Sequence, residues 1–93
     1  MDNAPEIYRA LGNETRLSIV RELARQNREV PSAKIVTSCS VALGLAQPTL
    51  SQHFARLVAC GVLTQRKQGI EKFYKLNDAA IEAAGIDLKR WRR

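Results

Sequence analysis

Residues 47–76 constrain the fold more than any other stretch, because helical spacing of apolar residues is followed directly by two strand-like runs. The helical part has an apolar stripe made of Leu50, Phe54, Leu57, Val58 and Gly61. Thr49, Gln52 and Arg56 project from the opposite side, and Ser51 and His53 lie on the flanks. A helix with one apolar face and one polar face, followed by a hairpin, is typical of a winged helix-turn-helix.

The hairpin is predicted from two runs, Val62–Lys67 and Ile70–Leu76, joined around the pair Gln68-Gly69. Alternation along the second run predicts that Tyr74 and Leu76 share one strand face and point inward. The tip of this hairpin is basic, which suits a ribbon lying against a polyanion.

The remaining segments are predicted to be helical. A short helix begins near Pro5, has Ile7, Tyr8 and Leu11 on its apolar side and ends at Gly12. Asn13 caps a second helix that runs to about Gln26. Its expected core residues are Leu17, Val20, Leu23 and Ala24.

A polar loop, Asn27–Ser32, separates that helix from a third over Ala33–Leu43, which Gly44 terminates. Pro48 opens the helix with the polar face only a few residues later, as a helix-turn-helix requires. Asn77 or Asp78 caps a last helix that breaks at Gly85 and restarts after Asp87. We therefore predict a mainly α fold with a β-hairpin wing, a winged helix-turn-helix of about five helices plus two strands, forming one domain over residues 1–93.

The charge is concentrated in the second half of the chain. The net charge is +6, with +1 in residues 1–46 and +5 in residues 47–93. A basic excess that coincides with the polar helix and wing predicts a polyanionic partner, namely double-stranded DNA. No apolar run approaches the roughly 18 residues of a membrane span, and no apolar signal segment opens the chain. We expect a cytoplasmic location and no membrane partner.

Each candidate DNA contact has a chemical reason. Gln52 can read adenine through its amide, and Arg56 can pair with guanine or a phosphate. Side chains near the helix N-terminus, those of Thr49, Ser51 and His53, have the reach for phosphates or base edges. On the hairpin, backbone or minor-groove contacts are expected from Arg66, Lys67 and Lys72.

Catalytic and metal chemistry have little support. His53 is the only histidine, there is no glycine-rich phosphate loop, and carboxylates are not clustered, so we expect no enzyme, no metal site and no cofactor. Cys39 and Cys60 stand outside any CxxC pairing, which predicts free, largely buried thiols. Both flank the helix-turn-helix, so a thiol- or redox-responsive repressor stays open as an alternative.

Two stretches, IYRALGNETRLSIVRELA and VALGLAQPTLSQHFARLVACGVLTQRKQGIEKFYKLN, resemble the ArsR/SmtB family of bacterial winged-helix transcriptional repressors. The resemblance implies a homodimer built from the first and last helices that binds an imperfect inverted repeat. It also implies repression that is relieved when a ligand or modification lowers DNA affinity. The family's reading-helix positions correspond here to Gln47, Thr49, Ser51, Gln52, His53 and Arg56.

The departures from the family pattern concern its metal sites and its tail. Where metal-sensing members carry a thiolate pair, this chain has Ile35 and Thr37, which do not bind soft metals. The tail offers only Asp78, Glu82 and Asp87 in place of the family's second metal site. It ends in LKRWRR, where Trp91 either packs across a dimer interface or accompanies a basic end that adds phosphate contacts.

Two classes of function remain open. The first is a dimeric, sequence-specific repressor that lacks the familiar metal sites and answers to an unknown signal. The second is a winged-helix protein-interaction module without sequence readout. Short polar side chains at Thr49, Ser51 and Gln52 favour the repressor, because interaction faces more often display aromatic or aliphatic anchors.

Overall fold

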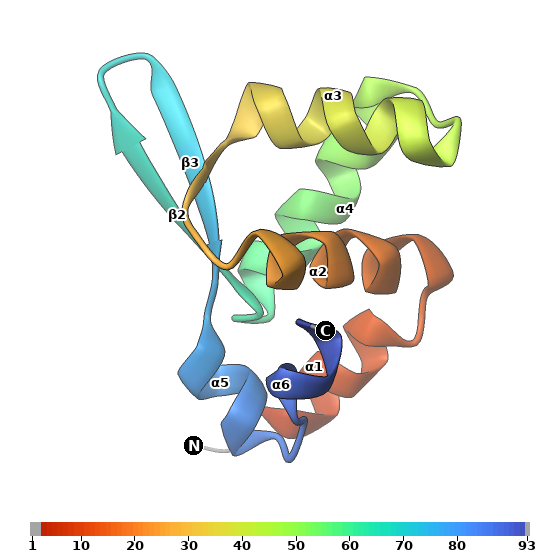
Figure 1. The fold of residues 1–93 in the computed structure, drawn as a ribbon, viewed down its shortest axis with the longest axis vertical. Coiled ribbons are helices and arrows are strands. Elements are labelled where there is room, and N and C mark those ends of the chain that lie inside the picture. The colour runs from red at the N-terminus through yellow and green to blue at the C-terminus, as the bar shows by residue number, and fades with distance from the viewer. Residues whose placement is uncertain (1–2, 93) are drawn as a thin grey trace.

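The computed structural model describes residues 3–92, and this range contains six helices and three strands (Figure 1). In chain order they are α1 (Ala4–Leu11), α2 (Glu14–Gln26), β1 (Val30–Pro31), α3 (Ser32–Leu43), α4 (Gln47–Ala59), β2 (Leu63–Gln68), β3 (Glu71–Leu76), α5 (Asp78–Ala83) and α6 (Leu88–Trp91). The predicted winged helix-turn-helix is confirmed. The described range has one helix and one strand more than the five helices and two strands predicted. The tail forms two separate helices, and the predicted loop contains the short strand β1.

The helix boundaries follow the local signals closely. The side chain of Asn13 accepts a hydrogen bond from the backbone N–H of Arg16 at 3.0 Å, as an N-cap should. Asn77 caps α5 and Asp87 caps α6 in the same way. Gly44 ends α3 with φ +67°, a left-handed conformation that glycine adopts without strain.

The sheet is antiparallel, with β3 between β1 and β2. Its hairpin closes through a two-residue turn whose first residue, Gly69, has φ +63°. The prediction of a loop was wrong at Val30, which pairs with Tyr74 and is buried. Two residues carry no strand pattern of their own, so only the partner strand makes them a strand.

The core lies where α1, α2, α3 and α4 meet the sheet. Leu50, Phe54 and Leu57 are fully buried, as the apolar stripe of α4 predicts, and the Phe54 ring stacks on Tyr74 with centroids 4.8 Å apart. Inward-facing Tyr74 and Leu76 are also confirmed. The prediction was wrong for Leu17, which is only half-buried, and the buried residue on that helix is Ile19.

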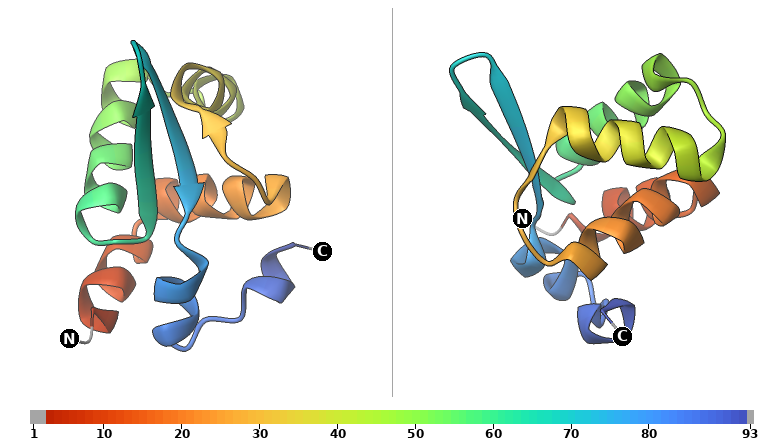
Figure 2. Two further views of the ribbon diagram at one scale, coloured as in Figure 1. Left: turned by 90° about the vertical axis from the view of Figure 1, so that its left-hand side faces the viewer. Right: turned by 45° about the horizontal axis from the view of Figure 1, so that its top comes forward.

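The tail folds back onto the molecule. Helices α5 and α6 lie beside α1 and α2 at the end of the molecule away from the wing tip (Figures 1 and 2). The guanidinium of Arg92 donates to the Ala24 carbonyl oxygen at 3.2 Å and to the Asp78 carboxylate at 3.0 Å. Tyr8 is half exposed instead of facing the core, and its hydroxyl donates to the Ala84 carbonyl oxygen.

Candidate nucleic-acid interface

The turn between α3 and α4 fixes the direction in which α4 leaves the core. Gly44 reverses the chain, and the Ser40 hydroxyl donates to the Leu45 carbonyl oxygen at 2.6 Å, which ties the turn to the last turn of α3. Ala46, the N-cap of α4, provides no side-chain hydrogen bond. The first turn of α4 contains no acidic residue either, so its N-terminus presents backbone N–H groups and the positive end of the helix dipole outward.

The polar face of α4 is open. Five of the predicted contacts are exposed on it, namely Gln47, Thr49, Ser51, Gln52 and Arg56. None of their side chains forms a hydrogen bond or ion pair with another residue in the range 3–92. The wing tip and the N-terminal half of α4 lie toward the same end of the molecule (Figure 2). Free donors and acceptors beside a ribbon can pair with the base edges and phosphates of a duplex.

His53 occupies a different environment from the other residues of this helix. It is half-buried, and its Nδ1 lies 3.3 Å from the guanidinium of Arg16 on α2. Desolvation lowers the pKa of His53, and the nearby charges of Arg16 and Arg56 lower it further. The ring is therefore neutral near pH 7 and faces the body of the protein, which makes it a support for α4.

The wing carries its cations in two arrangements. Arg66 forms an ion pair with Glu29, with its nitrogens 2.9 and 2.7 Å from the two carboxylate oxygens, and lies 4.6 Å from the Phe73 ring centroid. The hydrogen bond from Arg66 lowers the pKa of Glu29. Lys67 is exposed, and the half-buried Lys72 has its ammonium 5.7 Å from the Tyr74 ring centroid. Of the three predicted wing contacts, Lys67 is thus the one whose side chain has no ion pair, hydrogen bond or ring contact within the described range.

The two thiols differ in exposure. Cys39 is buried on α3, where desolvation, with a smaller contribution from Glu22, raises its pKa to about 11. Cys60 is half-buried at the end of α4, and its thiol donates to the Leu57 carbonyl oxygen at 3.4 Å. Cys39 is therefore protonated and shielded, and Cys60 is the thiol that solvent reaches more easily.

The residues at the family's metal positions have other surroundings here. Ile35 is buried in the core, Thr37 is exposed, and Asp78 is engaged by Arg92. Within residues 3–92, no group of three histidine, cysteine or carboxylate side chains is arranged to hold a metal ion. In the same range, every helix is too short or too polar to cross a membrane.

Two contacts of this region were not predicted from the sequence. Arg16 contacts His53 across 37 positions of the chain, and Arg9 on α1 lines the same cleft as Arg56 in the last turn of α4. Neither position belongs to the helix-turn-helix pattern. Only the packing of α1 and α2 against α4 brings them to it.

Comparison with known families gives a match over residues 13–65 to the bacterial regulatory proteins of the arsR family. The chain is 35% identical over 81 residues to an uncharacterised HTH-type transcriptional regulator of Methanocaldococcus jannaschii, covering 87% of this chain and 85% of that protein. It is 37% identical over 87 residues to the HTH-type transcriptional repressor SmtB of Mycobacterium tuberculosis, covering 94% of this chain. The match spans only 60% of that repressor.

Among solved structures, the fold is similar to the transcriptional repressor PagR of Bacillus anthracis, with a TM-score of 0.70 and 30% identity over 95% of this chain and 91% of that one. It is also similar to HlyU of Vibrio cholerae, with a TM-score of 0.66 and 31% identity over 87% of this chain and 84% of that one.

Proposed function

This chain belongs to the arsR family of bacterial regulatory proteins, and from that premise we propose that it is a dimeric, sequence-specific repressor that binds an imperfect inverted repeat in double-stranded DNA. The family is one of DNA-binding transcriptional regulators and not of enzymes. We propose that residues 1–93 act as one DNA-binding domain. A cytoplasmic location follows from this proposal, because the operator lies there.

The observation that supports this function most strongly is the open polar face of α4. Thr49, Gln52 and Arg56 are exposed and unpaired within the described chain, while the opposite face of the same helix is fully buried. In this proposal α4 enters the major groove, where Gln52 and Arg56 contact base edges. Gln47, Thr49 and Ser51 hold phosphates near the helix N-terminus.

The other predicted contacts have secondary roles in this proposal. His53 holds α4 against α2, and Lys67 and Lys72 place the wing along the DNA backbone. Arg66 would have to leave Glu29 to bind DNA, so we assign it the role of holding the wing in position.

The alternative, a protein-interaction module, has less support from the surface. In the described range the large exposed hydrophobic residues are Tyr8, Val41 and Ile70, and all three lie outside α4. A docking face on α4 would need apolar anchors that this helix does not display. Ile70 stands at the tip of the wing, where an apolar side chain can also insert beside a groove.

The dimer contact is proposed to involve α1 together with α5 and α6. Trp91 is half-buried and α6 packs on α2 of its own chain, so most of its ring is used within one protomer. Tyr8 on α1 offers an aromatic surface that is 51% exposed to a second copy. We propose that the signal which relieves repression acts without the familiar metal sites. A thiol response, if present, would use Cys60 rather than the shielded Cys39.

The experiment that tests this function is selection of bound duplexes from a random DNA library at near-physiological salt. We expect enrichment of an inverted repeat whose half-sites lie about one helical turn apart. Arg56→Ala should weaken the enriched site by about 1–3 kcal/mol if it reads a base. Binding that depends on salt alone, without an enriched sequence, would favour the interaction module.

A further inference from the structure

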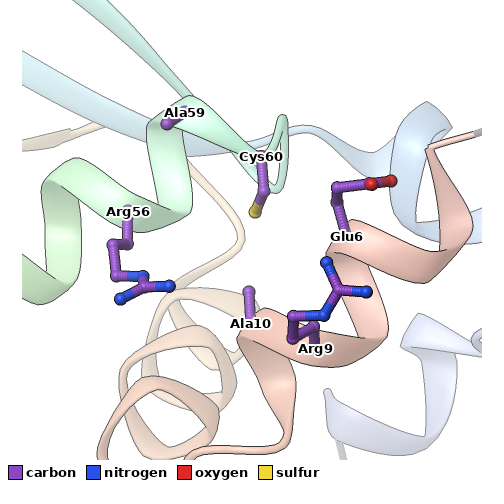
Figure 3. A pocket seen from close by; sticks show the side chains of 6 residues that line it. All are labelled: Glu6, Arg9, Ala10, Arg56, Ala59 and Cys60. Atoms are coloured by element: carbon purple, nitrogen blue, oxygen red, sulfur yellow. The ribbon is translucent and has the colours of Figure 1, made fainter.

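A cleft of about 240 Å³ separates α1 from the last turns of α4 (Figure 3). It is lined by Glu6, Arg9, Ala10, Arg56, Ala59 and Cys60. One wall is therefore part of the proposed DNA-reading helix, and the other belongs to a helix outside the helix-turn-helix. Apart from Arg56, no residue that lines this cleft is among the proposed DNA contacts.

Hydrogen bonds fix the separation of the two walls at both ends. At one end the side-chain amide of Asn3 donates to the Cys60 carbonyl oxygen at 2.8 Å. At the other end Arg16 donates to the Ala10 carbonyl oxygen at 2.8 Å and contacts His53 of α4. The cleft is thus preformed and does not need a ligand to hold it open.

Two guanidinium groups border this space. Figure 3 shows Arg56 and Arg9 on either side of Ala10, with the thiol of Cys60 pointing into the region between them. Both arginines are exposed, and neither has a hydrogen bond or ion pair with another residue in the described range. The Glu6 carboxylate lies on the far side of Arg9 from Arg56 (Figure 3). The lining therefore carries two unpaired cations and one carboxylate, and its net charge is positive.

We propose that this cleft binds the oxyanion group of a small molecule, a phosphate or a carboxylate, held between Arg9 and Arg56. The planar fork of a guanidinium donates two parallel hydrogen bonds to such groups. The cleft is smaller than the roughly 300–1,000 Å³ of drug-sized pockets, so the ligand is a small anion. Small alanine side chains leave room for the anion beside the cations.

The effect of this anion on DNA binding rests on the proposed function, because Arg56 would contact both the anion and the DNA. An anion held in the cleft engages the Arg56 guanidinium and cancels part of the local positive charge. The DNA then loses one contact of the reading helix. A small oxyanion would therefore lower DNA affinity, which identifies a chemical class for the missing signal.

The first test uses the DNA-free chain and inorganic phosphate as the probe. Amide chemical shifts are followed by NMR while phosphate replaces chloride at constant ionic strength and pH. We expect saturable shifts on both walls of the cleft, with affinity lowered about tenfold by Arg9→Gln, the cost of one charge-assisted contact. Arg28→Gln removes the same charge from an exposed position elsewhere and should leave the affinity unchanged. Absent or non-saturable shifts, or equal losses in both variants, would overturn the site.

The second test measures binding of the selected DNA at equal ionic strength in phosphate and in chloride. The native chain should bind more weakly in phosphate, by no more than Arg56→Ala weakens binding in chloride, and Arg9→Gln should reduce this difference. An unchanged affinity would overturn the competition. If Arg9→Gln weakens DNA binding in chloride more than Arg28→Gln does, the oxyanion is a DNA phosphate and the free-anion proposal is wrong. Failure to bind any DNA would contradict the proposed function but not the first test.

Discussion

The two ends of the molecule use their polar side chains differently. At the end formed by α3, α4 and the wing tip, the exposed side chains of α4 have no partners within the described chain. At the opposite end, Asn3, Tyr8 and Arg92 all donate to backbone carbonyl oxygens of distant segments. Side chains committed to internal hydrogen bonds stabilise the fold, whereas uncommitted ones at an ordered surface are free to bind another molecule.

This difference separates effects on stability from effects on DNA binding. A substitution on the buried side of α4 should lower stability most, one on its open face should change only binding, and one of the hydrogen-bonded residues at the opposite end should weaken the fold slightly.

The largest effect is expected for Phe54→Ala. Phe54 is fully buried and stacks on Tyr74, so its removal loses the transfer free energy of the ring and leaves a cavity. We expect the free energy of unfolding to fall by about 3–5 kcal/mol, measured by urea denaturation. The neighbouring exposed position provides the control, because Ala55→Ser should change stability by less than about 0.5 kcal/mol. A loss below 1 kcal/mol at Phe54 would mean that α4 is not anchored as described.

Gln52→Ala should weaken binding to the selected DNA site by about 1–3 kcal/mol, because a bidentate contact with one base is lost. Its unfolding curve should coincide with that of the native chain, since the side chain is exposed and unpaired. Fluorescence anisotropy on the selected site and on random DNA measures the effect. Equal losses on both sequences would show that Gln52 contacts the backbone and reads no base.

Tyr8→Phe should lower the free energy of unfolding by about 0.5–1.5 kcal/mol, the net contribution of one hydrogen bond. The hydroxyl donates to the Ala84 carbonyl oxygen and joins α1 to the end of α5. The affinity of the folded protein for the selected DNA should not change, because the substitution keeps the ring. A change in DNA affinity without a change in stability would show that Tyr8 on α1 contributes to DNA binding and not to the stability of the fold.

The smallest effect is expected at the junction between the two regions, where His53 contacts Arg16. Its folded-state pKa is lowered mainly by desolvation, so below the ordinary value of 6.5 the unfolded chain binds more protons than the folded one. Stability should therefore fall as the pH drops through 6.5, and the loss should level off below the folded-state pKa. Denaturation of native and His53→Gln chains between pH 7.5 and about pH 5 measures this window. A pH dependence that is identical in the two chains would exclude His53 as its source.

Local signals in the sequence were sufficient for much of the fold. Asn13 was predicted as a cap, and Asn77 as one of two candidates, because a short polar side chain before a helix satisfies free N–H groups wherever it occurs. The cap at Asp87 was not predicted. The apolar stripe of α4 was readable because its period is that of a helix. The same periodicity predicted that Thr49, Gln52 and Arg56 project from the polar side of α4, whereas Gln47 was added only through the family resemblance.

The errors arose where distant segments decide the structure. Val30 forms a strand only because β3 lies beside it, and Ile19 is buried in place of Leu17 because α2 packs against several elements at once. Helical spacing predicts which side of a helix faces the core, but not how much of its circumference the neighbouring elements cover.

The sequence by itself determined the order of the helices, their caps, the turn before α4 and the basic hairpin, because each depends on residues within a few positions of one another. Only the tertiary structure decided which polar groups remain free. Arg66 is paired with Glu29 across 37 positions, and His53 with Arg16 across the same separation. The cleft between Arg9 and Arg56 likewise exists only because the fold brings α1 beside the end of α4, where Asn3 donates to the Cys60 carbonyl oxygen. Long-range partners cannot be inferred from local spacing, because the packing of the whole chain selects them.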